Sequence, residues 1–118
     1  MTRIEKYATV WLSLALLAFA ACDVWAKRAR IGREAQKHVD IGRYVAEFRD
    51  YERAAAHYET AVEKSPRSKP LLFTLGALYQ KSADYAKAEK TYKKLLHLYP
   101  LDSDAHLCLG NLYLAQKH

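Results

Sequence analysis

The chain has 118 residues, of which 51% are hydrophobic, 12% aromatic and 27% charged, and these values are typical of one folded domain and exclude a disordered chain. Its two cysteines, Cys22 and Cys108, lie 86 positions apart, which excludes a disulfide-stapled mini-protein and a cysteine-rich zinc module. The net charge of +6 is uneven, because residues 1–38 hold seven lysines and arginines against three acidic residues, whereas residues 39–118 hold twelve against ten.

The longest apolar stretch lies near the N-terminus, over residues 7–26, and holds one charged residue, Asp23. A helix of this length reaches about 30 Å, the thickness of a bilayer core. Trp11 and Trp25 lie toward its ends, where indole rings favour the lipid–water boundary, and basic residues follow at once. The sequence therefore predicts a membrane anchor over residues 1–33, represented by Trp11, Leu14, Leu17, Trp25, Lys27 and Arg28.

Two other interpretations of this segment stay open. It is similar to a cleaved secretory signal, with Arg3 and Lys6 as the basic start and small residues at 18–21 near a cut site. It is also similar to a lipoprotein signal that ends at Cys22, although Phe19 stands where an aliphatic residue is usual. Either interpretation leads to a released or lipidated periplasmic adaptor in place of an uncleaved anchor.

Charge sets two further expectations for the N-terminal segment. Asp23 is expected to pair with Lys27 at i+4 near the membrane surface, or to contact a partner helix within the lipid. Five lysines and arginines lie over residues 27–37, against two and the amino terminus before the span. The positive-inside tendency then favours a single-pass protein of the inner membrane with its C-terminal part in the cytoplasm, and a periplasmic location is the alternative.

A shift of 34 residues aligns the rest of the chain with itself. Gly42, Gly76 and Gly110 fall on one another, as do Tyr58 and Tyr92. The middle copy holds, at fixed spacings, Leu72, Leu75, Gly76, Tyr79, Ala88, Tyr92 and Pro100. This pattern resembles the tetratricopeptide repeat, and the resemblance covers about residues 35–118, which corresponds to two full repeats and a half.

The resemblance and the apolar periodicity predict an all-α chain, in which a transmembrane helix precedes a short α-solenoid over residues 34–118. Asp50 and Asp84 are expected to cap the second helix of each repeat, and the repeated glycines to permit close helix approach. Residues 27–33 are expected to continue the membrane helix into the first repeat. The expected repeat helices cover residues 34–48, 51–64, 68–81, 85–98 and 102–116.

The resemblance implies a protein-binding module whose concave face, lined by the first helix of each pair, takes up a peptide or a helix. Carried onto this chain, that face presents mostly apolar positions: Val39, Arg43, Phe73, Ala77, Gln80, Leu107, Asn111 and Leu114. The clamp of lysine, asparagine and arginine with which some members of the family hold an acidic tail is missing from these positions. An equal alternative is that Phe73 and Leu107 only pack against neighbouring helices.

The last expected helix is apolar nearly all round over residues 105–115, although a solenoid usually ends in a polar face. Part of this surface is therefore expected to be covered. A partner subunit, a second copy of the chain or the membrane-proximal segment are the candidates.

No residue pattern indicates catalysis. The five histidines form no metal-ligand pair, and the four glycines form no phosphate loop. Cys108 is expected to be an inert buried thiol, and Lys87, Lys90 and Lys94 to form a solvated face, with Glu89 bonded to Lys93. The sequence therefore predicts no enzyme, no cofactor, no bound metal and no nucleic-acid partner.

These expectations converge on a membrane-anchored scaffold or accessory subunit that binds another protein in or at a membrane complex. The periplasmic adaptor described above is one alternative. The other is a structural subunit whose main contact lies in the lipid, through Ser13, Ala15 and Asp23.

Overall fold

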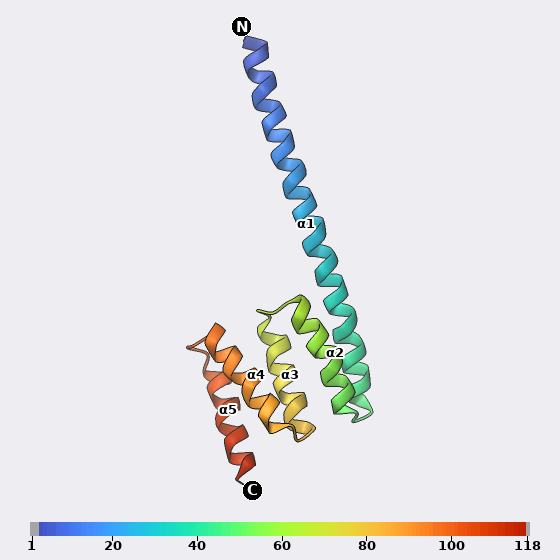
Figure 1. Cartoon of the computed structure of the whole chain (residues 1–118), viewed down its shortest axis with the longest axis vertical. Helices are drawn as coiled ribbons and strands as arrows, with labels where there is room; N and C mark the ends of the chain where they lie inside the picture. Colours follow the sequence, from blue (N-terminus) through green and yellow to red (C-terminus); the bar gives the residue numbers. More distant parts are fainter. Residues whose placement is uncertain (1–2, 118) are drawn as a thin grey trace. The chain divides into compact units, whose positions relative to one another are not determined.

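The computed structural model describes residues 3–117, and over these residues the chain is all-α, with no strand (Figure 1). It divides after Gly32 into two compact units. The helices are α1 (Arg3–Glu47), α2 (Tyr51–Lys64), α3 (Lys69–Lys81), α4 (Tyr85–Leu98) and α5 (Ser103–Gln116). The expected repeat helices agree with α2 to α5 within one residue, and α1 runs unbroken through residues 27–33, as expected.

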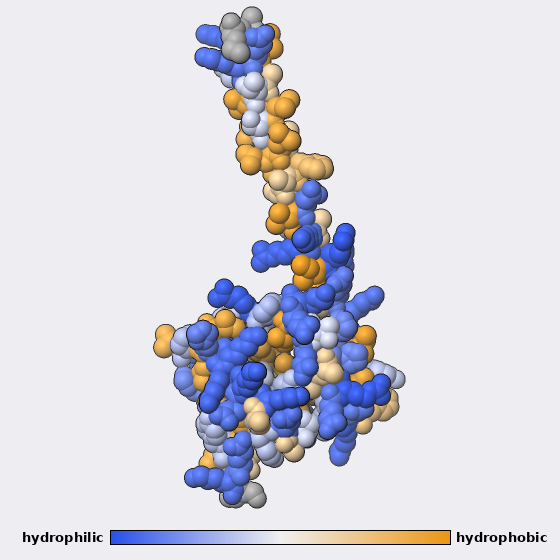
Figure 2. Space-filling view, viewed as in Figure 1, coloured by the Kyte–Doolittle hydropathy of each residue, from blue (hydrophilic) through white to orange (hydrophobic). Residues whose placement is uncertain are grey.

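The described part of the first unit is residues 3–32 of α1, and all of these residues are exposed except Ala29, which is partly exposed. Figure 2 shows apolar surface, in orange, along the middle of this part of the helix and hydrophilic side chains, in blue, toward both of its ends. By length and composition α1 could cross a membrane, and no residue of its most apolar window is buried within the described structure. The expected ion pair of Asp23 with Lys27 was wrong: it is not among the ion pairs within residues 3–117, and an exposed pair gains little in water.

The second unit begins at Arg33, and short turns reverse the chain between its helices, so that α3, α4 and α5 lie side by side (Figure 1). The expected caps are confirmed. The carboxylate of Asp50 accepts a hydrogen bond from the amide of Arg53, and that of Asp84 from the amide of Lys87, each at 3.3 Å. These bonds satisfy amides that have no partner within the helix.

The residue before each of these caps lies in the left-handed region of backbone space. Arg49 has φ 60° and Ala83 has φ 63°, and the two positions are equivalent in the 34-residue repeat. Neither is a glycine, although a side chain in this conformation costs about 1–2 kcal/mol. Both repeats thus make the turn between their helices with the same backbone conformation.

The core of the second unit is built from small residues and rings that recur with the repeat. Ala54 and Ala88 are fully buried, and the ring of Tyr58 lies against Gly42. A Cβ atom at Gly42 would come within 2.8 Å of that ring, and a Cβ at Gly76 within 2.5 Å of the ring of Tyr92. The expected close helix approach is therefore confirmed at these two glycines.

The same expectation was wrong at Gly110. No described atom lies within 4 Å of the place where its Cβ would be, and the residue is exposed. The reason is that among residues 3–117 no helix follows α5 to pack against it.

Candidate protein-interaction surfaces

The predicted concave stripe comes from α1, α3 and α5, and at one repeat position its residues become more exposed along the chain. Val39 is 8% exposed and belongs to the core, Phe73 is half-buried against the core, and Leu107 is 62% exposed. The three residues occupy equivalent repeat positions, so the difference reflects how many helices follow each one. Phe73 is therefore partly packed, as the packing alternative expects, and partly accessible, whereas Leu107 is exposed. Val39 is buried in the core, so its place among the predicted binding residues was wrong.

The other predicted positions are more accessible than Val39. Ala77 and Gln80 are partly exposed on α3, whereas Arg43, Asn111 and Leu114 are exposed. Together they offer apolar contact, one guanidinium group and two side-chain amides. Such a combination can hold an apolar segment of a partner and fix its direction through backbone hydrogen bonds.

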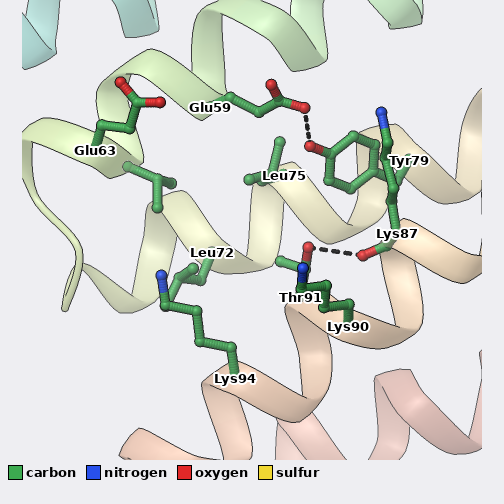
Figure 3. A pocket seen from close by; sticks show the side chains of 10 residues that line it. Glu59, Glu63, Leu72, Leu75, Tyr79, Lys87, Lys90, Thr91 and Lys94 are labelled. Atoms are coloured by element: carbon green, nitrogen blue, oxygen red, sulfur yellow. Dashed lines mark hydrogen bonds between the residues drawn. The ribbon is translucent and has the colours of Figure 1, made fainter.

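A groove of about 430 Å³ is lined by residues of α2, α3 and α4 (Figure 3). The sequence pattern did not predict it. Leu72, Leu75 and Val62 are its apolar members. The charged residues that line it are Glu59 and Glu63 from α2, and Lys87, Lys90 and Lys94 from α4. In the sequence, these residues form two helical stripes of opposite charge. Glu59 and Glu63 are spaced i, i+4 on α2, and the three lysines are spaced i, i+3, i+7 on α4.

Several polar groups of the groove are already paired. The hydroxyl of Tyr79 donates a hydrogen bond to Glu59, and the two side chains point toward one another in Figure 3. Burial and this bond raise the pKa of Tyr79. The Lys87 ammonium lies 5.6 Å from the centre of the Tyr79 ring, and the Thr91 hydroxyl donates to the Lys87 carbonyl at 2.8 Å. These contacts connect α2, α3 and α4 along the groove. Glu63, Lys90 and Lys94, which also line it, are exposed to solvent.

The basic face of α4 is confirmed in one detail, because the Lys93 ammonium pairs with Glu89 at 2.7 Å. The same carboxylate accepts a hydrogen bond from the Tyr113 hydroxyl of α5 at 2.9 Å. Both contacts lower the pKa of Glu89. This carboxylate thus links the two last helices.

The side chains that could bind a metal ion or act as nucleophiles are spread over several helices of the described chain. Within residues 3–117, no three His, Cys, Asp or Glu side chains lie close enough to hold a metal ion. Cys108 is half-buried, and burial raises the pKa of its thiol, which makes it a poor nucleophile. The rings of His38 and His57 stack with centres 5.9 Å apart between α1 and α2.

The last helix is covered on one side. Ala105 and Leu112 are fully buried, and Leu109 is half-buried against the core. Leu107 and Leu114 are exposed. The apolar character of residues 105–115 therefore serves packing in part and leaves a second side open.

A comparison with protein families agrees with this geometry. A family model described as tetratricopeptide repeat matches residues 46–112, from the end of α1 into α5. The match covers more than half of the chain. It includes both left-handed turns, at Arg49 and Ala83, and the contact of Gly76 with Tyr92, whereas Gly42, which contacts Tyr58, lies before the matched residues. The chain belongs to the tetratricopeptide repeat family.

Proposed function

We propose that the chain is a membrane-anchored scaffold or accessory subunit that binds another protein in or at a membrane complex. Tetratricopeptide repeats suggest a protein–protein interaction scaffold. The observation that carries the membrane part is the apolar window of α1, in which no residue is buried by the described structure. In water such a surface would be costly, because contiguous exposed apolar patches of this size drive association.

The polar side chains of the apolar segment support an anchor. The hydroxyl of Thr9 donates to the carbonyl of Lys6 at 2.8 Å, and that of Ser13 to the carbonyl of Thr9 at 2.9 Å. Both hydroxyls are thereby satisfied within the helix, which removes most of the cost of placing them in lipid. Trp11 and Trp25 are exposed toward the two ends, as rings at a membrane boundary would be.

The proposed orientation places the repeats in the cytoplasm, on the basis of the basic residues after the span. Lys27 and Arg28 would then lie at the level of the lipid headgroups. A periplasmic location is the competing orientation. Tethering to a surface raises the local concentration of the repeats near membrane partners, so a modest intrinsic affinity suffices.

The proposed role is binding without catalysis, a cofactor or nucleic acid. The contacts would come from the accessible members of the concave stripe. These are Arg43, Phe73, Ala77, Gln80, Leu107, Asn111 and Leu114. Leu107 and Leu114, the exposed leucines of α5, contribute apolar area to this surface, and burial of such area stabilises a complex by about 25 cal/mol per Å².

The anchor is tested by alkaline extraction of membranes from cells that express the full chain, together with the intact mass of the product. The proposal expects a chain that stays in the membrane pellet and retains its N-terminal segment. Leu14→Arg combined with Leu17→Arg should shift it toward the soluble fraction, because each charge costs roughly 2.5–3.5 kcal/mol near a helix centre. Leu101→Arg is the matched control, since Leu101 is 97% exposed outside the apolar segment.

Three results would count against the proposal. A wild-type chain that extracts freely is not an anchored protein. A mass that corresponds to cleavage before Cys22 indicates the released or lipidated adaptor. Retention of the chain in a membrane complex after deletion of residues 35–118 indicates a structural subunit that acts through the lipid.

A further inference from the structure

One turn of α1, directly after its apolar part, carries three cations, Lys27, Arg28 and Arg30. All three side chains are exposed, and none of them belongs to an ion pair among residues 3–117. Figure 2 shows hydrophilic side chains where the orange apolar surface of the helix ends. These three residues are called the basic turn.

The two carboxylates nearest to the basic turn along the helix leave its charge uncompensated. Asp23 precedes Lys27 by four residues, a spacing that permits pairing, but it makes no ion pair among the described side chains. Glu34 follows Arg30 by the same interval, but its carboxylate pairs with Lys64 of α2 at 3.4 Å. The basic turn therefore offers its positive charge to a group outside the described chain.

Depth along the helix places the basic turn among phospholipid headgroups once α1 spans a bilayer. From Lys27 to Arg30 the helix rises about 4.5 Å, and the headgroup layer on each side of the hydrocarbon core is about 5–8 Å thick. Trp25 lies two residues before Lys27 and is 74% exposed, and an indole ring favours the boundary between hydrocarbon and headgroups. The whole basic turn therefore fits within one headgroup layer, where lysine and arginine stems reach toward phosphate.

We propose that the basic turn binds the phosphate groups of anionic phospholipids, and that the chain thereby gathers such lipids around its anchor. In a zwitterionic phospholipid the headgroup ammonium compensates the phosphate, whereas an anionic phospholipid leaves a negative charge for the protein to neutralise. Arg28 and Arg30 can each hold a phosphate through two parallel N–H···O bonds, and Lys27 adds a point charge. A basic residue at a membrane surface favours anionic lipid by about fivefold.

This inference rests on the proposed anchor and names the class of lipid that surrounds it. It does not depend on the orientation of the chain, because the basic turn meets a headgroup layer on whichever side of the membrane the repeats lie. The attraction is electrostatic, so salt should weaken it. The screening length falls from about 10 Å at 0.1 M ionic strength to about 3 Å at 1 M.

Trp25 provides a reporter beside the basic turn, since Trp25 and Arg28 are spaced i, i+3 and lie on the same side of the helix. The full chain with Trp11→Phe, in which Trp25 is the only tryptophan left, is reconstituted into vesicles of phosphatidylcholine with a minor fraction of phosphatidylglycerol. Brominated acyl chains, which quench nearby indole fluorescence, are carried either by the phosphatidylglycerol or by an equal amount of the phosphatidylcholine. Quenching should show phosphatidylglycerol enriched about fivefold around Trp25, and high salt should bring this preference toward one.

Two triple variants of this chain locate the preference. The first neutralises the basic turn: Lys27→Gln, Arg28→Gln and Arg30→Gln. It should lower the preference from about fivefold to about one. The matched control removes the same charge from exposed cations of the second unit: Arg67→Gln, Lys90→Gln and Lys94→Gln. It should keep the preference of the parent chain, and circular dichroism verifies that both variants are helical.

The lipid preference is overturned, and the anchor is not, if the chain floats with the vesicles but both brominated lipids quench equally. It is also overturned if the basic-turn variant keeps the preference or if the control variant loses it. Loss of the preference when inorganic phosphate replaces chloride at constant ionic strength would show that the site takes free phosphate in place of lipid. A chain that does not float with the vesicles contradicts the anchor itself, and the lipid preference falls with it.

Discussion

Lys69, the first residue of α3, pairs through its ammonium group with Asp102, the N-cap residue of α5. The Asp102 carboxylate also accepts a hydrogen bond from the amide of Ala105 at 3.0 Å. The lysine and the amide together hold the pKa of Asp102 below its ordinary value, and the carboxylate raises the pKa of Lys69. One carboxylate thus begins the last helix and ties it to the first helix of the preceding repeat.

This pair predicts an acid-sensitive contribution to stability. A carboxyl group with a lowered pKa in the folded state stabilises the fold above the ordinary aspartate pKa of about 3.9, and this contribution is lost as pH falls through the lower folded value. The free energy of unfolding, measured with urea, should therefore fall below about pH 4. Asp102→Asn keeps a capping side chain but removes the charge, so it should flatten this part of the profile.

Asp104→Asn is the matched control, because Asp104 lies in the first turn of the same helix and makes no ion pair among the described side chains. It should leave the acid slope of the wild-type chain nearly intact. Identical profiles for Asp102→Asn and the wild type would show that the pair with Lys69 contributes nothing.

The repeated glycines predict opposite effects of one substitution. Gly76→Ala should destabilise the fold by about 1–3 kcal/mol, because the new Cβ would lie 2.5 Å from the Tyr92 ring. Gly110→Ala should stabilise it by about 1 kcal/mol, since alanine is the better helix former and nothing described is near. Thermal denaturation of both variants measures the difference, and a shift of the same sign in both would contradict the packing described here.

The left-handed turn predicts a stabilising glycine. Ala83→Gly should raise the free energy of unfolding by up to about 1 kcal/mol, because glycine adopts a φ of 63° without steric cost. Ser82→Gly is the control, since Ser82 has φ −82° and its hydroxyl donates to the Tyr79 carbonyl at 2.9 Å. That variant should be destabilised, and urea unfolding of the pair measures both signs.

Burial of Tyr92 predicts a late ionisation. Burial raises the pKa of Tyr92 to about 12, so its phenol stays protonated when exposed tyrosines ionise near pH 10. Absorbance at 295 nm should show late ionisation in the wild type, and Tyr92→Phe should reduce its amplitude without removing it, because the pKa of Tyr79 is raised as well. Because the folded pKa is raised, folding is favoured below about pH 10 and this contribution is lost as pH rises through 12.

The helices and caps were predictable because their signals are local. Asp50 and Asp84 stand directly before apolar periodic segments, and a cap acts over three residues. The glycine–tyrosine contacts at Gly42 and Gly76 were partly predictable, since recurrence at a fixed period indicates a shared packing role.

Position in the array could not be derived from the repeat pattern. Val39 and Leu107 occupy equivalent positions, yet one is buried and the other exposed, because burial depends on which helices follow. The groove was missed for a related reason. Glu59 and Lys90 lie on different helices, and the pattern of either helix alone gives no sign that they line one hollow.

Arg49 and Ala83 have nearly the same φ, so the segment between them is a unit that begins and ends with the same turn conformation. Cutting and rejoining the chain at these two equivalent points, or duplicating the stretch between them, preserves the backbone path at each junction. Since each unit contacts mainly its neighbours, the array can lengthen or shorten by whole units without any change to the N-terminal segment. Under the proposed function, the size of the binding surface can therefore evolve separately from the membrane anchor.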